Sequence, residues 1–418
     1  MEKLGCLFCR RQYPLDMFFP FCPSCHEPLL FSYPSKKRIF FWEKKASLEK
    51  FLDFLPLSKI NLRFSLGEGN TSLIELSRLR KKRNLPALFA KNETVNPTHS
   101  FKDRGTSVAV QKAISLGIKR IGTVSTGNMA SSTAAYGAKA GLETYLFLKE
   151  GSSTEKIVST GMHGPFLLTV KGDYGQLFSK SFALGKKYDI YFANSVDPLR
   201  IEGYKPTGYE IFLQLEGRTP QFIFVPVSSG GHLIGLMRAF LDLKEEGFTQ
   251  HIPTFVGVQA QGCCPIARAF ASGKSKFTRI KKAVTVAHAI SNPAPPGGNI
   301  VLKMMQENKG IILAVSDREI LDAQRELAEL EGILCDPASA TTLAGLIKLS
   351  RRKKFKTFDR IVLVITGSGL KDMDVLKSHK INLHQTSLPN LEKAMEKLLH
   401  GSKYLISKRL TLLHRKIG

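Results

Sequence analysis

Three short loops rich in glycine and hydroxyl residues each follow an apolar stretch that is expected to form a buried strand. They read STGN at 125–128, SSGGH at 228–232 and TGSG at 366–369. Backbone N–H groups in such loops, next to a helix N-terminus, favour an anion. The second loop suits a single phosphate, because it lacks both the Gly-Lys-Ser/Thr of a Walker loop and the glycine spacing of a dinucleotide site.

The side chains of these loops could bind different parts of one small ligand. Asn128 offers an amide to a phenolate oxygen, and Thr366 offers a neutral hydroxyl to a ring nitrogen. The residues that would bind the phosphate are Ser228, Ser229, Gly230, Gly231 and His232. A flat ring with these three groups is pyridoxal phosphate, provided that a lysine is available to form the Schiff base. Taken singly, each loop is also explained as an ordinary turn between a strand and a helix.

The stretch NPTHSFKDRG supplies that lysine. Pro97 keeps the chain out of a helix, Ser100 can cap the helix that follows, and Lys102 falls in its first turn. A cation is unfavourable at this end of a helix dipole, so Lys102 is better explained as a neutral imine. Asp103 and Arg104 are expected to stabilise the helix start and the packing of two lobes.

Apolar strands and amphipathic helices alternate from residue 86 onward, which places the three loops at strand ends. Strands are predicted over 86–94, 121–125, 144–149, 166–170, 189–194, 221–227, 254–260, 311–316 and from 360 into the third loop. Helices are predicted over 101–117, 128–141, 174–188, 232–247, 318–332 and 338–350, and 48–57 has helical spacing. Ser316 and Glu319 form a capping box. The alternation predicts parallel sheets in two α/β lobes, with ligands at the carboxyl ends of the strands.

The composition indicates a folded protein with a strongly basic charge. Of the 418 residues, 43% are hydrophobic, and the formal net charge is +26. Such a charge attracts anions, but the Lys and Arg residues stand in scattered short runs, which are usually solvated faces. No apolar run approaches the roughly 20 residues of a membrane span, and the N-terminus resembles neither a secretory signal nor a transit peptide. We therefore expect a cytoplasmic protein with neither a membrane nor a nucleic-acid partner.

Four of the seven cysteines form two CxxC pairs near the N-terminus. They are Cys6, Cys9, Cys22 and Cys25. Two such pairs separated by a short apolar segment are typical of a zinc ribbon, in which four thiolates bind one structural ion and leave no open coordination site. A ribbon that keeps its fold without a metal is the alternative. The other cysteines are expected in the core or in loops.

The motifs NPTHSFKDRG, STGN, NSVDPLRIEG, VPVSSGGH, GVQAQG, EGILCDPASATTLAG and TGSGLKD occur in the order seen in threonine synthases. The chain therefore resembles this family within the tryptophan-synthase-β-like, fold-type II pyridoxal-phosphate enzymes. The resemblance implies that Lys102 is the Schiff-base lysine, that Asn128 bonds the ring phenolate, and that 228–232 and Thr366 contact the cofactor. The residues that resemble the clamp for the substrate's own phosphate are Ser125, Asn194, Ser195 and Arg200, with Arg200 giving a bidentate grip.

The same resemblance implies a two-lobed α/β fold with a small zinc-ribbon-like segment at the N-terminus. We expect the ribbon over 1–40, a large cofactor-binding domain from 41–95 and 211–380, a small domain over 96–210, and a basic helical tail over 381–418. A homodimer is expected. The implied reaction converts O-phospho-L-homoserine and water into L-threonine and phosphate.

Several positions depart from the family pattern. His99 stands where the family usually has glycine, Ser228 and His232 replace asparagine or glycine in the phosphate loop, and Ser368 replaces a commoner histidine. Met129 directly follows Asn128, where a hydroxyl residue is common near the leaving phosphate.

Because methionine cannot donate a hydrogen bond, a paralogue with another substrate is the alternative. Examples are a cysteate-synthase-like β-replacement on O-phosphoserine, or a Ser/Thr dehydratase. A non-enzymatic, basic, nucleic-acid-binding protein is a third class, but such a protein would have no need to keep Lys102.

Overall fold

The computed structural model describes residues 3–33, 37–41, 43–151, 154–379, 381 and 383–399. Its contacts divide the chain into two units, Met1–Met373 and Asp374–Gly418. In the second unit residues 391–399 are helical, and 400–418, which make up most of the predicted tail, lie outside the described residues. The domain boundaries predicted within the first unit stay predictions.

The larger sheet of the first unit has six strands in the order β12-β11-β10-β13-β5-β4. The parallel strands are β5 (Ala87–Asn92), β10 (Phe222–Pro226), β11 (Thr254–Ala260), β12 (Ile311–Val315) and β13 (Arg360–Ile365). The short β4 (Leu73–Glu75) closes one edge antiparallel to β5. The central strands are β-branched and aromatic runs, which suits burial on both faces of the sheet.

The smaller sheet has four parallel strands in the order β8-β7-β6-β9. They are β6 (Arg120–Val124), β7 (Glu143–Lys149), β8 (Phe166–Val170) and β9 (Tyr191–Phe192). The helices between them are α4 (Asn128–Ala140), α5 (Thr154–Gly161) and α6 (Tyr174–Tyr188). The predicted alternation of strands and helices is confirmed in this part of the chain.

The helices around the larger sheet bury the apolar side chains on its two faces. They are α2 (Ser77–Arg83), α8 (Lys205–Gln214), α9 (Gly231–Glu245), α10 (Pro265–Ala271), α11 (Gly298–Glu307), α12 (Asp317–Glu331) and α13 (Pro337–Ser350). Helix α12 begins with the predicted capping box of Ser316 and Glu319. Together the two sheets confirm the predicted two-lobed α/β fold.

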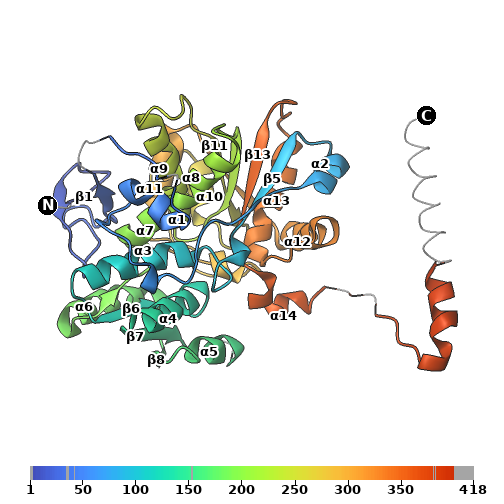
Figure 1. Ribbon diagram of the computed structural model, residues 1–418, viewed down its shortest axis with the longest axis horizontal. Helices are drawn as coiled ribbons and strands as arrows, with labels where there is room; N and C mark the ends of the chain where they lie inside the picture. The colour runs from blue at the N-terminus through green and yellow to red at the C-terminus, as the bar shows by residue number, and fades with distance from the viewer. Residues whose placement is uncertain are drawn as a thin grey trace. The chain divides into compact units, whose positions relative to one another are not determined.

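Two helices, α3 (Lys102–Ser115) and α7 (Pro198–Gly203), pack against each other between the two sheets (Figure 1). Helix α3 also contacts α4 of the smaller sheet, and α7 contacts α9 of the larger one. A Cβ on Gly105 would lie 2.5 Å from Cε1 of Tyr204, and a Cβ on Gly203 would lie 2.6 Å from the carbonyl oxygen of Arg104. The close approach of the two helices therefore requires glycine at both positions.

The N-terminal segment forms a small antiparallel sheet in the order β2-β1-β3. Its strands are β1 (Lys3–Gly5), β2 (Gln12–Pro14) and β3 (Leu30–Ser32). Leu4 and Phe31 are buried in one cluster with Val110 of α3. On the other side, Nδ2 of Asn299 in α11 donates to Oε1 of Glu27 at 2.7 Å. The segment thus contacts elements that pack with both sheets.

Two local expectations differ from the structure. The stretch 48–57 forms only α1 (Ser47–Lys50) and a 3-10 turn, η1 (Leu52–Phe54), because its aromatic rings turn inward and pack on Tyr209. Ser100 does not cap α3, and its hydroxyl is buried without a partner among the described residues. Instead the Asp103 carboxylate accepts bonds from the backbone N–H and hydroxyl of Thr98, which supports the predicted role of Asp103 at the helix start.

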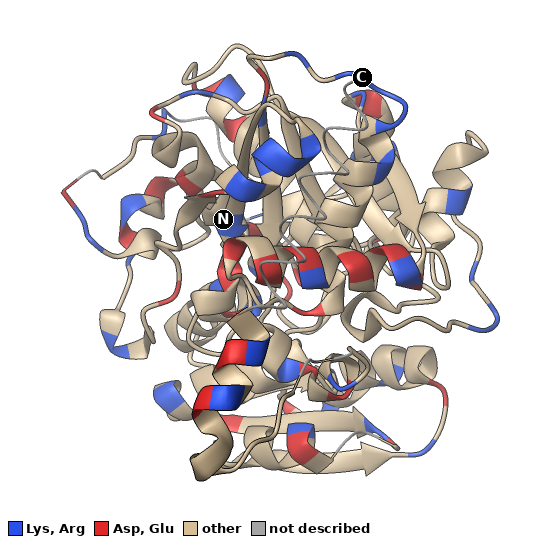
Figure 2. Ribbon diagram, turned by 90° about the vertical axis from the view of Figure 1, so that its right-hand side faces the viewer, with Lys and Arg blue, Asp and Glu red and all other residues tan. Residues whose placement is uncertain are grey.

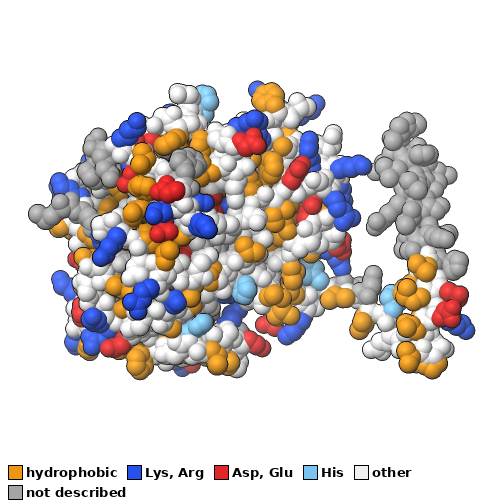
Figure 3. All heavy atoms as spheres, in the orientation of Figure 1, with side chains coloured by type: hydrophobic (Ala, Val, Ile, Leu, Met, Phe, Trp, Pro, Cys, Tyr) orange, Lys and Arg blue, Asp and Glu red, His pale blue; other side chains and the backbone are white. Residues whose placement is uncertain are grey.

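Positively and negatively charged residues are mixed along the ribbon in Figure 2. On the face shown in Figure 3, Lys and Arg lie among Asp, Glu and hydrophobic side chains rather than in one basic patch. This distribution agrees with the interpretation of the lysine runs as solvated faces. Within the described residues, the helices are too short or too polar to cross a membrane.

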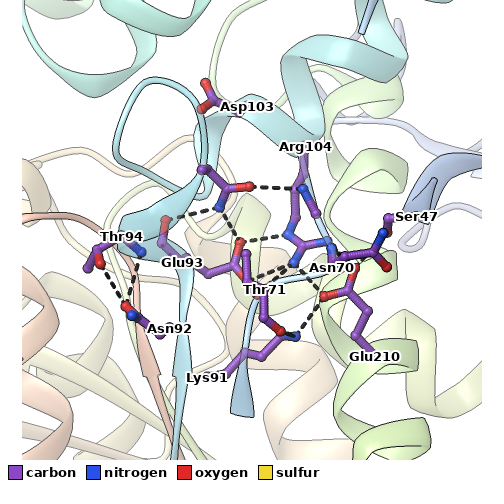
Figure 4. Close-up of polar contacts among 12 residues, drawn as sticks. Ser47, Asn70, Thr71, Lys91, Asn92, Glu93, Thr94, Asp103, Arg104 and Glu210 are labelled. Atoms are coloured by element: carbon purple, nitrogen blue, oxygen red, sulfur yellow. Dashed lines mark hydrogen bonds and ion pairs between the residues drawn. The ribbon is translucent and has the colours of Figure 1, made fainter. Parts of the chain in front are cut away.

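A buried cluster of charges fixes α3 to the larger sheet (Figure 4). The guanidinium of Arg104 donates to both carboxylate oxygens of Glu93 at 2.6 and 2.8 Å and to both of Glu210 at 2.7 and 2.8 Å. The ammonium of Lys91 donates to Glu210 at 2.6 Å. All four side chains are at most 5% exposed. Two cations therefore balance two carboxylates in a dry interior, with their donors directed at acceptors.

Replacing Arg104 by methionine should destabilise the fold by about 3–5 kcal/mol, because the buried Glu93 would lose its paired cation and Glu210 would keep only Lys91. Denaturant unfolding of the purified variant measures this loss. Arg80→Met is the matched control, since Arg80 pairs with Glu75 at 3.3 Å on the surface, where both side chains are about half exposed. That exposed pair should contribute less than about 1 kcal/mol, and equal losses in the two variants would contradict the role given to the cluster.

Candidate active site

The three predicted loops lie where three strands meet their helices. The loop 125–128 joins β6 to α4, the loop 228–232 joins β10 to α9, and the loop 366–369 follows β13. All three strands belong to parallel ladders, so each loop is at a carboxyl end. Ligands of open α/β sheets bind at this edge.

The turn after β13 lies directly beside the residues that precede Lys102. The backbone N–H of Phe101 donates to the carbonyl of Thr366 at 3.0 Å, and Ser100 pairs with Gly367. A Cβ on Gly367 would lie only 3.3 Å from Nδ2 of Asn128. The first and third loops are therefore both adjacent to the start of α3.

Lys102 is the first residue of α3, and its amine lies against aromatic rings. Its Nζ is 4.3 Å from the ring centroid of Phe101 and 5.8 Å from that of Tyr204. In the part of the chain that the structure describes, no carboxylate forms an ion pair with it. Burial, together with the positive charge of Arg200, lowers the pKa of Lys102 to about 7. A large share of this lysine is therefore a neutral, nucleophilic amine at neutral pH.

His232 connects the phosphate loop to the same aromatic cluster. Its ring stacks on Phe101 with the centroids 3.9 Å apart and the planes at 19°, and its edge meets Tyr204. It is 7% exposed, and neither ring nitrogen has a hydrogen-bond partner among the described residues. Burial and the charges of Lys102 and Arg104 hold the pKa of His232 well below its usual range, so the ring is neutral. A buried neutral imidazole has one N–H to donate, and leaving it unpaired is costly.

The rest of the phosphate loop depends on backbone rather than on side chains. Gly230 has a φ of +99°, which favours glycine, and a Cβ on Gly231 would lie 2.7 Å from the carbonyl oxygen of Ser195. The hydroxyl of Ser229 accepts a bond from Nδ2 of Asn292 at 2.9 Å, and Ser228 is half-buried. Because backbone N–H groups bind a phosphate at such a turn, the departure of this loop from the family pattern is compatible with the predicted phosphate contact, which stays a prediction.

Two residues that the sequence-based reasoning did not single out lie behind Thr366. Ser339 in α13 is within hydrogen-bond distance of the Thr366 hydroxyl, with the two oxygens 2.9 Å apart. Its own hydroxyl donates to Oδ1 of Asp336 at 2.6 Å. Both belong to the motif EGILCDPASATTLAG, whose helix cap was visible in the sequence but whose partner across the fold was not.

The four residues expected at the substrate phosphate are not equally open in the structure. Asn194 is fully buried, and its amide bonds the backbone N–H of Val124 and the hydroxyl of Ser181. Arg200 is also fully buried. Ser125 and Ser195 are partly exposed.

The guanidinium of Arg200 donates only to uncharged oxygens. Its acceptors are the carbonyl of Ala193 at 2.7 Å and the hydroxyls of Thr106 at 2.6 Å and Thr133 at 2.9 Å. It forms no ion pair with a carboxylate of the described residues. The buried carboxylate of Asp197 interacts with the Arg200 charge without a direct ion pair, so the guanidinium is only partly balanced. A buried cation of this kind is costly unless an anion reaches it.

Comparisons with known proteins agree with this geometry. A family model described as pyridoxal-phosphate dependent enzyme matches residues 64–367. The threonine synthase of Methanosarcina acetivorans is 36% identical over 378 residues, which cover 89% of this chain and 93% of the relative. That of Methanocaldococcus jannaschii is 35% identical over 88% of this chain and 93% of the relative. The chain belongs to the pyridoxal-phosphate dependent enzymes and, within them, to the threonine synthase family.

Solved structures with low sequence identity share the fold. A fungal L-serine ammonia-lyase from Rhizomucor miehei superposes with a TM-score of 0.65 at 20% identity and covers 75% of this chain and 99% of its own. A threonine deaminase from Solanum lycopersicum gives a TM-score of 0.63 at 19% identity over 73% of this chain and 86% of its own. These likenesses confirm a fold-type II architecture.

The residues around Lys102 fit pyridoxal phosphate. The aromatic cluster holds an amine of lowered pKa, the His232 ring has a free donor, and Gly230 and Gly231 form a turn without side chains. Lys102, Asn128, Thr366 and the loop 228–232 would hold the cofactor. This assignment of contacts is a proposal that rests on their placement.

One of the family departures has a local explanation, and the structure places a second. His99 has a φ of +61°, in the left-handed region where glycine is unstrained, which accounts for the usual glycine at this position. Its backbone carbonyl still accepts the N–H of Ser368 at 3.0 Å. Met129 is 6% exposed in the first turn of α4 and brings no donor there.

The predicted metal cluster is assembled in the N-terminal segment. The sulfur atoms of Cys6, Cys9, Cys22 and Cys25 all lie within 4.8 Å of one another. The Cys6–Cys25 and Cys9–Cys22 sulfur distances are 3.9 and 3.6 Å. Tetrahedral zinc with bonds near 2.3 Å requires sulfurs about 3.8 Å apart, so the geometry fits a structural zinc ion. The remaining three cysteines are buried, as predicted.

Cys22→Ser should abolish zinc binding and lower the melting temperature, since three thiolates hold zinc more weakly than four. Metal content by mass spectrometry and a thermal melt measure both effects. Cys264→Ser is the control, because this buried thiol lies outside the cluster. Purified protein without zinc, or equal loss from the control, would contradict a structural metal site.

The lowered pKa of Lys102 gives the cofactor-free protein a specific pH dependence. Because the folded pKa is near 7 and the unfolded value is 10.5, the unfolded chain binds more protons between these pH values. The free energy of unfolding should therefore rise with pH in this window, by at most about 1.4 kcal/mol per pH unit. Urea unfolding at pH 7 and 9 should show this rise in the wild type and not in Lys102→Met. Lys139→Met, at an exposed lysine of α4, is the control, and an identical slope in Lys102→Met would refute the assignment.

Proposed function

We propose that this protein is a pyridoxal-phosphate-dependent threonine synthase that converts O-phospho-L-homoserine and water into L-threonine and phosphate. The observation that carries the proposal is a pair of neighbouring cations, the partly buried Lys102 at the start of α3 and the fully buried Arg200 of α7. Lys102 and Arg200 each lack a carboxylate partner among the described residues, and they are close enough for Arg200 to lower the pKa of Lys102. One phosphate on the cofactor and one on the substrate would give this site the anions that its charges require.

The cofactor, when bound, supplies an electron sink that stabilises negative charge on the carbons of the amino acid. The protein's own residues orient the reactants and move protons. Lys102 is suited to accept and return protons at these carbons, because its amine is close to half neutral at pH 7. The rings of Phe101 and Tyr204 lie against that amine.

Arg200 is proposed as the main grip on the substrate phosphate, together with Ser125, Asn194 and Ser195. Its present acceptors, Thr106 and Thr133, are neutral hydroxyls that a phosphate oxygen could replace at a gain in charge pairing. Thr133 lies one helical turn after Met129 on α4. It therefore offers a hydroxyl on the same face of the helix as the residue where the family usually has one.

A second candidate is a paralogue that carries out β-replacement on O-phosphoserine. Met129 favours it, since a buried methionine at the start of α4 cannot help to place an attacking water molecule. Threonine synthase is favoured by the two relatives, because both carry that name and both are matched over 93% of their length. The substrate class common to both candidates is a phosphate ester of an amino acid. The expectations of a homodimer and of a cytoplasmic location stay predictions.

Phosphate release from O-phosphohomoserine and from O-phosphoserine, measured side by side, separates the two candidates. Threonine synthase activity requires release from the first substrate with formation of threonine. Arg200→Met should lower kcat/KM by about 100-fold through the loss of a charge-assisted contact, with little change in cofactor affinity. Arg268→Met, at an exposed arginine of α10, is the control. Turnover of O-phosphoserine alone would overturn the assignment, and loss of cofactor from Arg200→Met would refute the division into two phosphate sites.

A further inference from the structure

The hydroxyl of Ser339 is a hydrogen-bond centre behind the proposed cofactor ring. Ser339 is fully buried, and its partners Asp336 and Thr366 are only 4% and 5% exposed. The backbone N–H groups of Thr366 and Gly367 donate to it at 2.9 and 3.0 Å. It donates in turn to Oδ1 of Asp336 at 2.6 Å. All of these contacts join α13 to the turn after β13.

The hydrogen-bond capacity of Ser339 is fully used by these three contacts. A serine hydroxyl has one proton to donate and two lone pairs to accept. Its proton goes to Asp336, because a carboxylate at 2.6 Å is a stronger acceptor than the carbonyl of Gly367 at 3.3 Å. Its lone pairs are occupied by the two backbone N–H groups. The Thr366 hydroxyl, 2.9 Å away, therefore cannot use Ser339 as an acceptor.

We propose that Ser339 and Asp336 are positioning residues that orient the Thr366 hydroxyl as a proton donor toward the cofactor's ring nitrogen. The inference rests on the proposed placement of the cofactor, because it assigns Thr366 to that nitrogen. The Thr366 hydroxyl has no other partner among the described residues, so its proton is free for the ligand. A hydroxyl that can only donate keeps a pyridine nitrogen unprotonated. Asp336 thus acts on the ring indirectly, because it holds the Ser339 proton away from the Thr366 oxygen. Ser339 in turn holds the backbone N–H groups of Thr366 and Gly367.

The surroundings of Asp336 keep this arrangement in place. Its Oδ1 also accepts the backbone N–H of Ser339 at 2.7 Å as the cap of α13. A Cβ on Gly367 would lie 2.7 Å from Oδ2 of Asp336, so no larger residue fits between the carboxylate and the turn. Burial raises the pKa of Asp336 to about 6. The hydrogen bonds from Ser339 and the charge of Lys371 lower this pKa, and the charge of Asp372 raises it. The carboxylate is therefore mostly ionised above neutral pH.

A double-mutant cycle on the cofactor-loaded protein tests the proposal. The variants are Ser339→Ala, Thr366→Val and both together, and Thr366→Ser is the conservative variant that keeps the hydroxyl. The readouts are the absorbance spectrum of the lysine-bound cofactor and its dissociation constant. Ser339→Ala should weaken cofactor binding about tenfold and shift the spectrum in the same direction as Thr366→Val. In the Thr366→Val background Ser339→Ala should change neither quantity further, because there is no hydroxyl left to orient.

A second cycle uses Asp336→Asn, which removes the charge but keeps a residue that caps helices equally well. It should shift the spectrum in the presence of Thr366 or Thr366→Ser and not in the Thr366→Val background. This cycle gives an answer even when the buried Ser339→Ala variant does not fold.

Two results distinguish failure of this inference from failure of the proposed function. Equal effects of Ser339→Ala or Asp336→Asn with and without the Thr366 hydroxyl would show a purely structural role and overturn the inference, while the wild-type spectrum and turnover stay intact. A wild-type protein without the absorbance of a lysine-bound cofactor would instead refute the cofactor placement, and the inference with it.

Discussion

The bidentate pairing of Arg104 with Glu93 and Glu210 is the constraint on which the site depends. Arg104 is the third residue of α3, two positions after Lys102, so whatever holds its guanidinium also holds the start of the helix. Glu93 follows β5 of the larger sheet, and Glu210 lies in α8. The Lys102 amine is therefore placed by a rigid charge cluster rather than by its own contacts, which leaves that amine free to react.

The buried cations of this molecule fall into two classes, and the contrast indicates where the ligands bind. Arg104 and Lys91 are balanced by two carboxylates, so that cluster is electrically complete without a ligand. Arg200 is fully buried and Lys102 is partly buried, but their direct contacts are with rings, carbonyls and hydroxyls. Because the interior cannot solvate a charge, an unbalanced cation is tolerated when an anion completes it. Charge balance thus separates the residues that build the fold from those that meet phosphate.

The sequence predicted the parts of the fold and site that depend on local chemistry. Strands, their following loops and the capping box at Ser316 are encoded within a few residues, and all were found where expected. The antiparallel β4 edge and the inward turn of Phe51 and Phe54 were not predicted, because packing against distant residues decides them. The same holds for the site. The position of Lys102 follows from its motif. The charge cluster that holds the start of its helix joins Arg104 to Glu210, which are 106 positions apart, and no local pattern reveals such a contact.

Hydrogen-bond direction is the property that a motif specifies least and that the chemistry depends on most. TGSG and DPASA place hydroxyls in a protein, but only their meeting in three dimensions decides which of them gives its proton and which receives one. At Ser339 two backbone N–H groups and one carboxylate use the whole hydrogen-bonding capacity of the hydroxyl. The neighbouring hydroxyl of Thr366 can therefore only donate to a ligand. His232 illustrates the same rule, since its neutral ring has a single N–H and no protein acceptor among the described residues. Neutral donors fixed in this way recognise the uncharged and anionic atoms of a ring cofactor, while backbone N–H groups of the loop 228–232 are proposed for its phosphate and Arg200 for that of the substrate.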